Sequence, residues 1–109
     1  MDKVVIESWL NAHGVVNYTI NEDMSVDVEG DVDCSNNELL DLVGCPLSVV
    51  GDYCCTNNRL TSLEGCPTYV VGNFNCDDNR IISLVGCPIS VIGNFNCGKN
   101  NLSNLLGLV

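Results

Sequence analysis

An internal repeat with a fixed period constrains this chain more than any other feature of its sequence. Its clearest copies are 50–60, 71–81 and 92–102, and a divergent first copy runs from 29 to 39. A second half-motif, Leu-Val/Glu-Gly-Cys-Pro, recurs at 42–46, 63–67 and 84–88. A fixed period in the twenties is typical of a solenoid, in which each unit buries its apolar face only against its neighbours. The sequence therefore predicts one domain, with a cap over residues 1–28 and four repeat units over residues 29–109.

The cysteines follow the same period. Of the eight, one series is Cys34, Cys55, Cys76 and Cys97, a second is Cys45, Cys66 and Cys87, and Cys54 belongs to neither. The sequence contains no C-x-x-C pair, so a tetrahedral zinc site has no local chelate. A free cysteine behaves as a small buried hydrophobe, which suits equivalent core positions in successive coils. We expect reduced thiols, and we expect no metal and no cofactor.

Each repeat contains a short segment in which apolar and polar residues alternate. In the third unit Phe74 and Cys76 are predicted to point inward, with Asn73 and Asn75 outward. Stacking these segments gives a parallel β-sheet of four strands. One asparagine follows each strand, and an amide that both donates and accepts is suited to the backbone groups of a turn. The predicted ladder comprises Asn37, Asn58, Asn79 and Asn100.

Residues 1–28 have the pattern of a cap. Asp2 is a suitable helix N-cap, and Gly14 is a suitable stop. The expected apolar face of the helix comprises Val5, Ile6, Trp9, Leu10 and His13. Residues 18–20 and 24–28 are expected to form a hairpin. We expect His13 to pack at the edge of this face rather than to bind a metal or act as a base.

The repeats match the leucine-rich repeat pattern L-x-x-L-x-L-x-x-N-x-L. The matching residues are Val50, Tyr53, Cys55, Asn58, Leu60; Val71, Phe74, Cys76, Asn79, Ile81; and Ile92, Phe95, Cys97, Asn100, Leu102. The motif Gly-Asn-Phe-Asn-Cys followed by Gly-Cys-Pro resembles that of small leucine-rich repeat proteins of tailed bacteriophages and some bacteria. The preceding segment, with Trp-Leu, Asn-Tyr-Thr-Ile-Asn and Val-Asp-Val, resembles the N-terminal cap of the same group. The resemblance implies a binding scaffold without catalytic residues. The expected fold class is an α/β repeat solenoid, a short leucine-rich repeat with a parallel β-sheet, capped N-terminally by a helix and a β-hairpin.

Charge is concentrated at one end of the chain. The net charge is −10, and residues 1–41 carry −9 of it. This balance argues against direct nucleic-acid binding through phosphates. No apolar run approaches the ~20 residues of a membrane span. We expect a cytoplasmic protein of an infected or bacterial host cell, with no membrane contact.

The candidate partner-binding residues are the outward strand positions, the acidic residues beside them and the carboxylates of the alternating stretch that precedes them. They are Asp27, Glu29, Asp31, Asp33, Asp52, Cys54, Asn73, Asn75, Asp77, Asp78, Asn94 and Asn96, of which Asp77 and Asp78 lie beside the columns. If residues 27–33 form one extended stretch, their carboxylates stand on one side about 6.6 Å apart. The repeat alignment places Glu29 inward, whereas the alternation places it outward. We favour the outward position, because an unpaired carboxylate inside a coil would cost several kcal/mol.

A column of carboxylates has three interpretations: a solvated face, a docking surface for a basic protein patch, or an imitation of a phosphate row. The hypothesis is a non-catalytic protein-binding module, a phage-type inhibitor that docks on a host protein. The alternatives are a structural or assembly protein, with a phage protein as its partner, and an acidic nucleic-acid mimic that blocks a DNA- or RNA-binding enzyme. An enzyme is not expected, because no nucleophile stands beside a base in the sequence pattern.

The last residues of the chain are apolar, and no second cap follows them in the repeat pattern. An apolar end of this kind is an association surface. The sequence therefore predicts self-association, as a homodimer through the C-terminal coil; the alternative is that residues 103–109 fold over the end of the solenoid themselves. The residues concerned are Leu105, Leu106, Leu108 and Val109.

Overall fold

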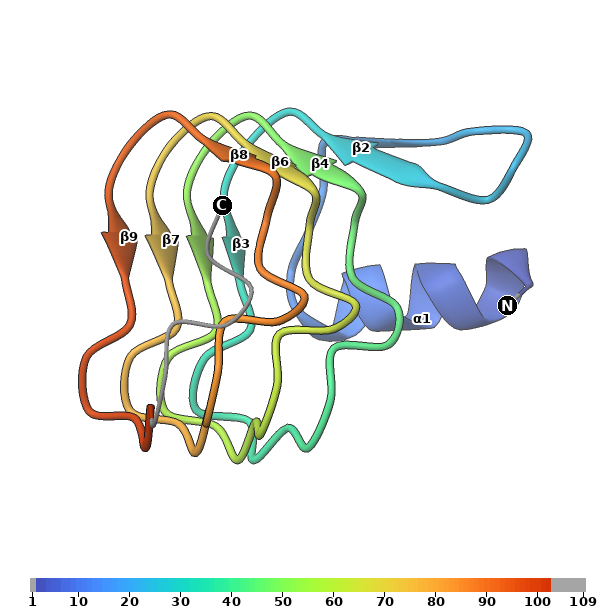
Figure 1. Cartoon of the computed structure of the whole chain (residues 1–109). Coiled ribbons are helices and arrows are strands. Elements are labelled where there is room, and N and C mark those ends of the chain that lie inside the picture. The colour runs from blue at the N-terminus through green and yellow to red at the C-terminus, as the bar shows by residue number, and fades with distance from the viewer. Residues whose placement is uncertain (1, 103–109) are drawn as a thin grey trace.

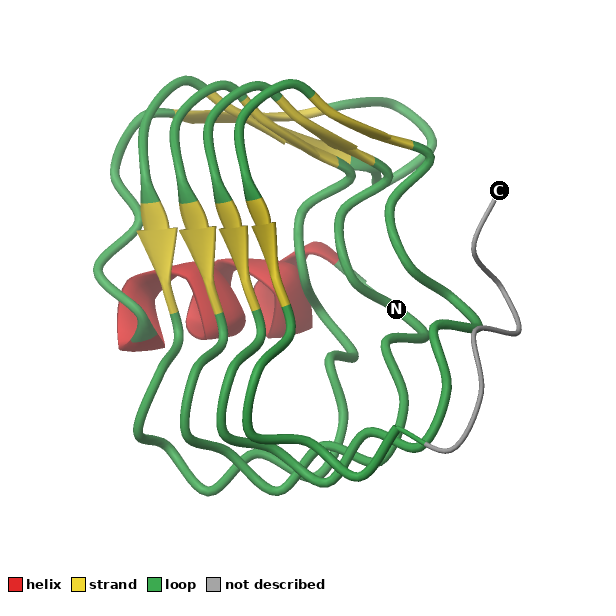
Figure 2. Cartoon of the chain, turned by 60° about the vertical axis from the view of Figure 1, so that its left-hand side comes forward, coloured by secondary structure: helices red, strands yellow, loops and turns green. Residues whose placement is uncertain are grey.

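The computed structural model describes residues 2–102. They form one N-terminal helix followed by a small β-solenoid (Figure 1). The helix, α1, spans Lys3–Ala12. Each coil contributes one strand to each of two sheets, which run along the stack on different sides (Figure 2). The four-stranded sheet contains β3 (Val32–Asp33), β5 (Tyr53–Cys54), β7 (Phe74–Asn75) and β9 (Phe95–Asn96). The five-stranded sheet contains β1 (Tyr18–Ile20), β2 (Val26–Val28), β4 (Ser48–Val49), β6 (Tyr69–Val70) and β8 (Ser90–Val91).

The strand register repeats the period of the sequence. Tyr53 pairs with Phe74 and Phe74 with Phe95, each one repeat further along the chain, and all pairs within the four-stranded sheet are parallel. This sheet confirms the parallel sheet expected from the alternating segments. The five-stranded sheet is a feature that the sequence analysis does not predict. Within the described residues the coils contain no helix, so α1 of the cap is the α component of the fold.

The core lies between the two sheets. Tyr53 and Phe74 are fully buried, and the rings of Tyr53, Phe74 and Phe95 stack with centroid separations of 5.2 and 5.1 Å. The buried members of the cysteine ladder are Cys34, Cys55 and Cys76, and all eight cysteines are free thiols. The first apolar position of the leucine-rich repeat pattern lies outside this core. Its residues Val50, Val71 and Ile92 are exposed by 54%, 46% and 73%.

The cap begins and ends where its sequence signals stand. The backbone N–H of Val5 donates to the Asp2 carboxylate at 3.0 Å, and Gly14 adopts a left-handed φ of 68° after the helix. The helix packs on the first coil through Ile6 and Leu10, whereas Val5 is half exposed. The expectation that Val5 faces the core is therefore wrong.

The hairpin is built into the solenoid rather than resting against it. Strand β1 pairs antiparallel with β2, and β2 pairs in parallel with β4 of the next coil. The second strand of the cap thus starts the five-stranded sheet. No helix of the described residues is long and apolar enough to cross a membrane.

The asparagine ladder has the structural role that the sequence predicts. The Asn58 amide donates to the carbonyls of Cys34 and Cys55 at 3.0 Å, and its oxygen accepts from the N–H groups of Asn37 and Leu39. Asn79 repeats the pattern one coil further on. Each amide ties two consecutive turns together, so it satisfies backbone groups that the turn would otherwise bury without partners.

Candidate partner-binding face

The first outward column of the four-stranded sheet is a hydrogen-bonded ladder. The Oδ1 atom of Asp31 accepts the backbone N–H of Asp52 at 2.7 Å. Asp52 does the same for Asn73, and Asn73 for Asn94, both at 2.8 Å. These side chains therefore stabilise the stack, a role that the sequence analysis does not assign to them. Each carboxylate still has lone pairs directed at solvent, because an ionised carboxylate accepts several hydrogen bonds.

A glycine makes room for each oxygen of this ladder. A Cβ atom added at Gly51 would lie 2.2 Å from Asp31 Oδ1 and 2.8 Å from the Gly30 carbonyl, and Gly72 and Gly93 are equally close to the coil before them. Glycine is needed wherever backbone approaches this closely. The sequence signal for the ladder is a Gly-Asp or Gly-Asn pair once per repeat, at 30–31, 51–52, 72–73 and 93–94.

The second outward column is fixed mainly by contacts within it and beside it. The Asp33 carboxylate accepts from the Ser35 hydroxyl and from the Ser35 N–H, and these bonds lower the pKa of Asp33. The Cys54 thiol is half-buried and donates to Thr56 Oγ1 at 3.2 Å, while Cys55 is fully buried. The outward direction predicted for Cys54 is therefore confirmed.

The later part of the column carries amides. The Asn96 side-chain amide donates to the oxygen of Asn75. Beside it, Asp77 accepts the backbone N–H of Gly98 at 2.7 Å. Asp78 is exposed and has a left-handed φ of 57°. Asp78 thus occupies a turn, not the sheet surface.

The expected row of four carboxylates on one side of an extended stretch is wrong. Strand β2 ends at Val28 and β3 begins at Val32, and the chain bends between them to pass from one sheet to the other. Asp27 therefore lies on the five-stranded sheet, and Asp33 on the four-stranded sheet. The alternation of buried and exposed residues continues from β2 into β3, because valines are buried in both strands. The alternation therefore does not reveal that the chain bends between them.

Asp27 joins the hairpin to the first coil. Its carboxylate accepts from the Ser48 hydroxyl at 2.6 Å and from the Asn21 amide at 3.1 Å, and these bonds lower the pKa of Asp27. Glu29 is exposed, as predicted from the alternation. The repeat alignment agrees with this position after all, because the equivalent Val50 is exposed too.

Three carboxylates remain together on the face of β3 and β5. We call Asp31, Asp33 and Asp52 the acidic patch; all three are exposed. No lysine or arginine occupies either outward column of the sheet. Among the described residues the ion pair is Arg59 with Glu38 at 3.5 Å, in the turn beyond the sheet. In the part of the chain that the structure describes, no lysine or arginine therefore pairs with the acidic patch, and His13 is close enough to Asp33 for its positive form to lower the pKa of Asp33, in addition to the larger effect of the Ser35 hydrogen bonds.

The remaining candidates are the metal-ligating residue types, His13 and the apolar C-terminal residues. Within residues 2–102 no three side chains of His, Cys, Asp or Glu are arranged to hold a metal ion. His13 packs on Trp9 with ring centroids 4.3 Å apart, and burial lowers its pKa. The predicted self-association residues, Leu105, Leu106, Leu108 and Val109, lie outside the described residues, so the homodimer stays a prediction.

Comparisons with protein family models, with curated proteins and with solved structures found no match. Inference about function therefore depends on the geometry of the acidic patch and on the repeat pattern.

Proposed function

We propose that this chain is a non-catalytic protein-binding module, which docks through the acidic patch on a basic surface of a protein partner. The observation that carries the proposal is that Asp31 and Asp52 carry negative charges that their structural hydrogen bonds do not require. At the ladder position, Asn73 holds the next coil with the same 2.8 Å hydrogen bond that Asp52 makes. An amide is thus sufficient for the fold, and the carboxylates of Asp31 and Asp52 add charge that the stack does not require.

The patch is also fixed before any partner arrives. Asp31 and Asp52 are each held by a backbone N–H, and Asp33 is held by Ser35. Ordered side chains lose little further entropy on binding, and negatively charged carboxylates steer a basic partner toward the face. Neighbouring strands are about 4.8 Å apart, and alternate residues of one strand about 6.6 Å. The three carboxylates therefore offer a compact site for arginine or lysine side chains.

The amides of the later coils extend this face. Asn73, Asn75, Asn94 and Asn96 continue both columns of the acidic patch. Amides donate as well as accept, so they recognise polar groups of either kind. The partner surface would therefore be basic over β3 and β5, and mixed polar over β7 and β9.

The finer form of the proposal is a leucine-rich repeat of the bacteriophage type, a cytoplasmic inhibitor of a host protein. Its support is the asparagine ladder, the inward aromatic and cysteine positions, and the acidic face. A structural or assembly role is the alternative, with a phage protein as the partner. A nucleic-acid mimic has less support, because the bend between β2 and β3 divides the carboxylate row on which it depends.

The test is affinity capture on the immobilised chain from a bacterial lysate, at low and high salt, followed by measurement of Kd for the purified partner. The variant D31N/D33N/D52N keeps one acceptor oxygen at each position, enough for the bonds that Oδ1 makes, and removes three charges. We expect its Kd to be at least about tenfold weaker, equivalent to about 1.4 kcal/mol, with most of the loss in the association rate at low salt.

The matched control is E22Q/D41N/E64Q, which removes the same charge from exposed positions away from the sheet face. Its Kd should stay near that of the unaltered chain. Equal weakening by the two triple variants would show that only net charge matters, and the docking site would be wrong. Capture of virion proteins, rather than a host enzyme, would favour the assembly role.

A further inference from the structure

Two thiols of the first coil meet at one buried hydroxyl. The Tyr53 hydroxyl oxygen lies 3.0 Å from the Cys45 sulfur and 3.5 Å from the Cys34 sulfur. The Tyr53 hydroxyl therefore brings the Cys34 and Cys45 thiols to one point. Tyr53 and Cys34 are fully buried, whereas Cys45 is half-buried.

One of the two equivalent thiols of the next coil is arranged differently. Cys55 Sγ donates to the Asn75 carbonyl at 3.5 Å, as Cys34 Sγ does to the Cys54 carbonyl at 3.4 Å. Cys66 Sγ instead donates to the Gly86 carbonyl at 3.1 Å, whereas Cys45 contacts the Tyr53 hydroxyl. The ring that lies over Cys55 and Cys66 belongs to Phe74, which has no hydroxyl. Both thiols of the next coil are therefore bonded to backbone of a neighbouring coil. The first-coil pair differs because tyrosine replaces phenylalanine in the aromatic column.

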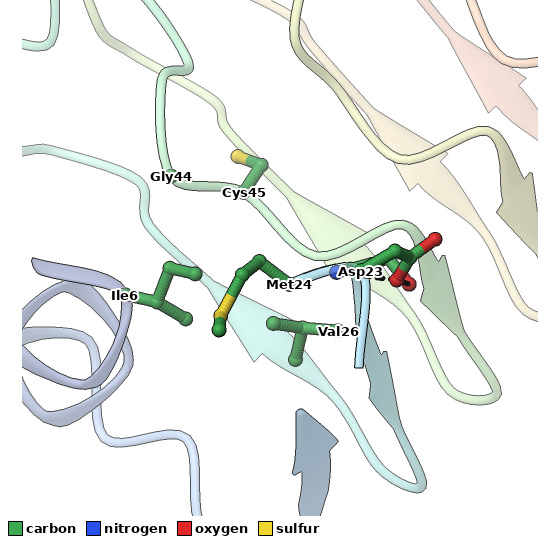
Figure 3. Close-up of a pocket in the computed structure, with 7 residues that line it drawn as sticks. Ile6, Asp23, Met24, Val26, Gly44 and Cys45 are labelled. Carbon is green, nitrogen blue, oxygen red and sulfur yellow. Dashed lines mark hydrogen bonds between the residues drawn. The ribbon is translucent and has the colours of Figure 1, made fainter. Parts of the chain in front are cut away.

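A groove reaches one member of the first-coil pair. It has a volume of about 550 Å³ and is lined by Ile6, Asp23, Met24, Ser25, Val26, Gly44 and Cys45. In Figure 3 the Gly44-Cys45 segment lies on one side of it, opposite Met24 and Val26, and the Met24 side chain extends toward Ile6. Cys45 is thus the member of the pair that lies at this groove, and its sulfur points away from Met24 and Val26 in Figure 3.

We infer that Cys34 and Cys45 form an intramolecular disulfide by exchange with a small neutral disulfide, RSSR, that enters this groove. Cys34 first loses its proton to solvent. Cys45 passes its own proton to the Cys34 thiolate, and the resulting Cys45 thiolate attacks one sulfur of RSSR, so that the S–S bond of RSSR breaks and one RS⁻ leaves. Cys34 then gives its proton to that RS⁻ and attacks the Cys45 sulfur, which releases the second RS⁻ for protonation by solvent. Two cysteine thiols are oxidised, and RSSR is reduced to two RSH.

The two thiols of the pair differ in acidity. Interaction with the Cys45 thiol lowers the pKa of Cys34, and the Tyr53 hydroxyl contributes in the same direction, whereas burial raises the pKa of Cys45 well above its usual range. In the next coil burial raises the pKa of Cys66 to about 12 and raises that of Cys55 further. Since the thiolate is the reacting species, Cys34 supplies the first-coil pair with a thiolate, the acceptor of the Cys45 proton, that the Cys55–Cys66 pair lacks. A neutral reagent is required because the chain carries a net charge of −10, with Asp23 at the groove.

The test uses the full-length reduced protein with Cys54→Ser, which removes the half-exposed thiol. It is treated with bis(2-hydroxyethyl) disulfide, then alkylated and cleaved on the N-terminal side of aspartates. Cleavage before Asp33, Asp41 and Asp52 separates residues 33–40 from residues 41–51, so a Cys34–Cys45 bond appears as one joined pair of peptides. We expect this bond to form at least about tenfold faster than a Cys55–Cys66 bond, which further cuts after Arg59 and after Tyr69 would distinguish from a Cys55–Cys76 bond.

Two comparisons keep the inference falsifiable. Tyr53→Phe reproduces the ring of the next coil, and we expect the Cys34–Cys45 bond to form several-fold more slowly in it. In urea-unfolded protein the preference for this pair should disappear. Faster formation of the Cys55–Cys66 bond in the folded protein would overturn the inference, as would accumulation of mixed disulfides without the joined peptides. An unchanged rate in Tyr53→Phe would overturn the part assigned to the hydroxyl.

Discussion

The first two coils and the last two coils use the same backbone arrangement with different chemistry. Asp31 and Asp52 make the ladder bonds of the early coils, and Asn73 makes the equivalent bond later. A tyrosine starts the aromatic stack that phenylalanines continue. The fold therefore needs an oxygen acceptor and a flat ring at these positions. The negative charge and the hydroxyl of the early coils go beyond that need, and both proposals made above depend on this difference.

The largest effect is expected from the asparagine ladder, which both halves of the molecule share. Asn58→Ala leaves the N–H groups of Asn37 and Leu39 and the carbonyls of Cys34 and Cys55 without this partner. Buried backbone groups without partners are costly, and we expect a loss of about 3 kcal/mol in the free energy of unfolding, measured by urea denaturation. Asn37→Ala, at the exposed start of the ladder, should cost well under half as much. Equal losses would mean that the ladder is not what holds the turns.

A smaller effect is expected where glycine admits the ladder oxygens. Gly51→Ala would place a methyl group 2.2 Å from Asp31 Oδ1 and 2.8 Å from the Gly30 backbone, so the coils must separate. We expect a loss of about 2 kcal/mol in unfolding free energy. Gly30→Ala is the matched control, because no atom lies within 4 Å of the added Cβ. A chain that tolerates both substitutions equally would contradict the close approach of the coils.

The exchange of aspartate and asparagine along the ladder can be tested directly. Asp52→Ala removes the acceptor for the Asn73 N–H and should cost about 1 kcal/mol. Asp52→Asn should leave the unfolding free energy nearly unchanged, because Asn73 makes the same bond in the next coil. Thermal denaturation of both variants gives the comparison. A loss as large for asparagine as for alanine would show that the charge is structural, and would remove the main support for the docking face.

The smallest effect is expected from acid. Hydrogen bonds from Ser48 and Asn21 lower the pKa of Asp27, and those from Ser35 lower the pKa of Asp33. A carboxyl with a lowered folded pKa contributes stability that is present above its unfolded value, near 3.9, and is lost as the pH falls through its folded value. Unfolding free energy should thus decline below about pH 4. Ser48→Ala should reduce the decline, as urea titrations at pH 6 and pH 3 would show; an unaltered decline would exclude Asp27 as a source.

The elements predicted from the sequence are those marked by a period. The spacing of the repeat sets the strand register, and the inward direction of Phe74 and the role of Asn58 follow from alternation and from turn chemistry. The five-stranded sheet could not be recognised, because strands of two residues such as β4 are too short to show alternation. The bend after Val28 was missed because both strands around it bury valines in the same phase.

The candidate site was predicted in part. The outward columns and the direction of Cys54 follow from alternation. The hydrogen bonds of Asp31 and Asp52 were missed, because each joins a side chain to the backbone of the equivalent residue in the next repeat. The distance between those two residues depends on how the coils stack, which the sequence does not show. The thiol cluster was missed for a similar reason: the Tyr53 hydroxyl belongs to one coil and the two cysteines to the coil before it.

Each side-chain oxygen of the ladder formed by Asp31, Asp52 and Asn73 packs against the glycine of the next coil. Because this contact is the same at each junction, neighbouring coils are interchangeable. Because every junction presents the same acceptor and the same gap, a duplicated block such as residues 72–92 would meet matching contacts at both of its ends. Tandem duplication could thus lengthen the protein without redesign of its interior, and each added block would enlarge the recognition surface by one further row. Growth by whole modules is a simple evolutionary route by which such a scaffold could follow a changing target.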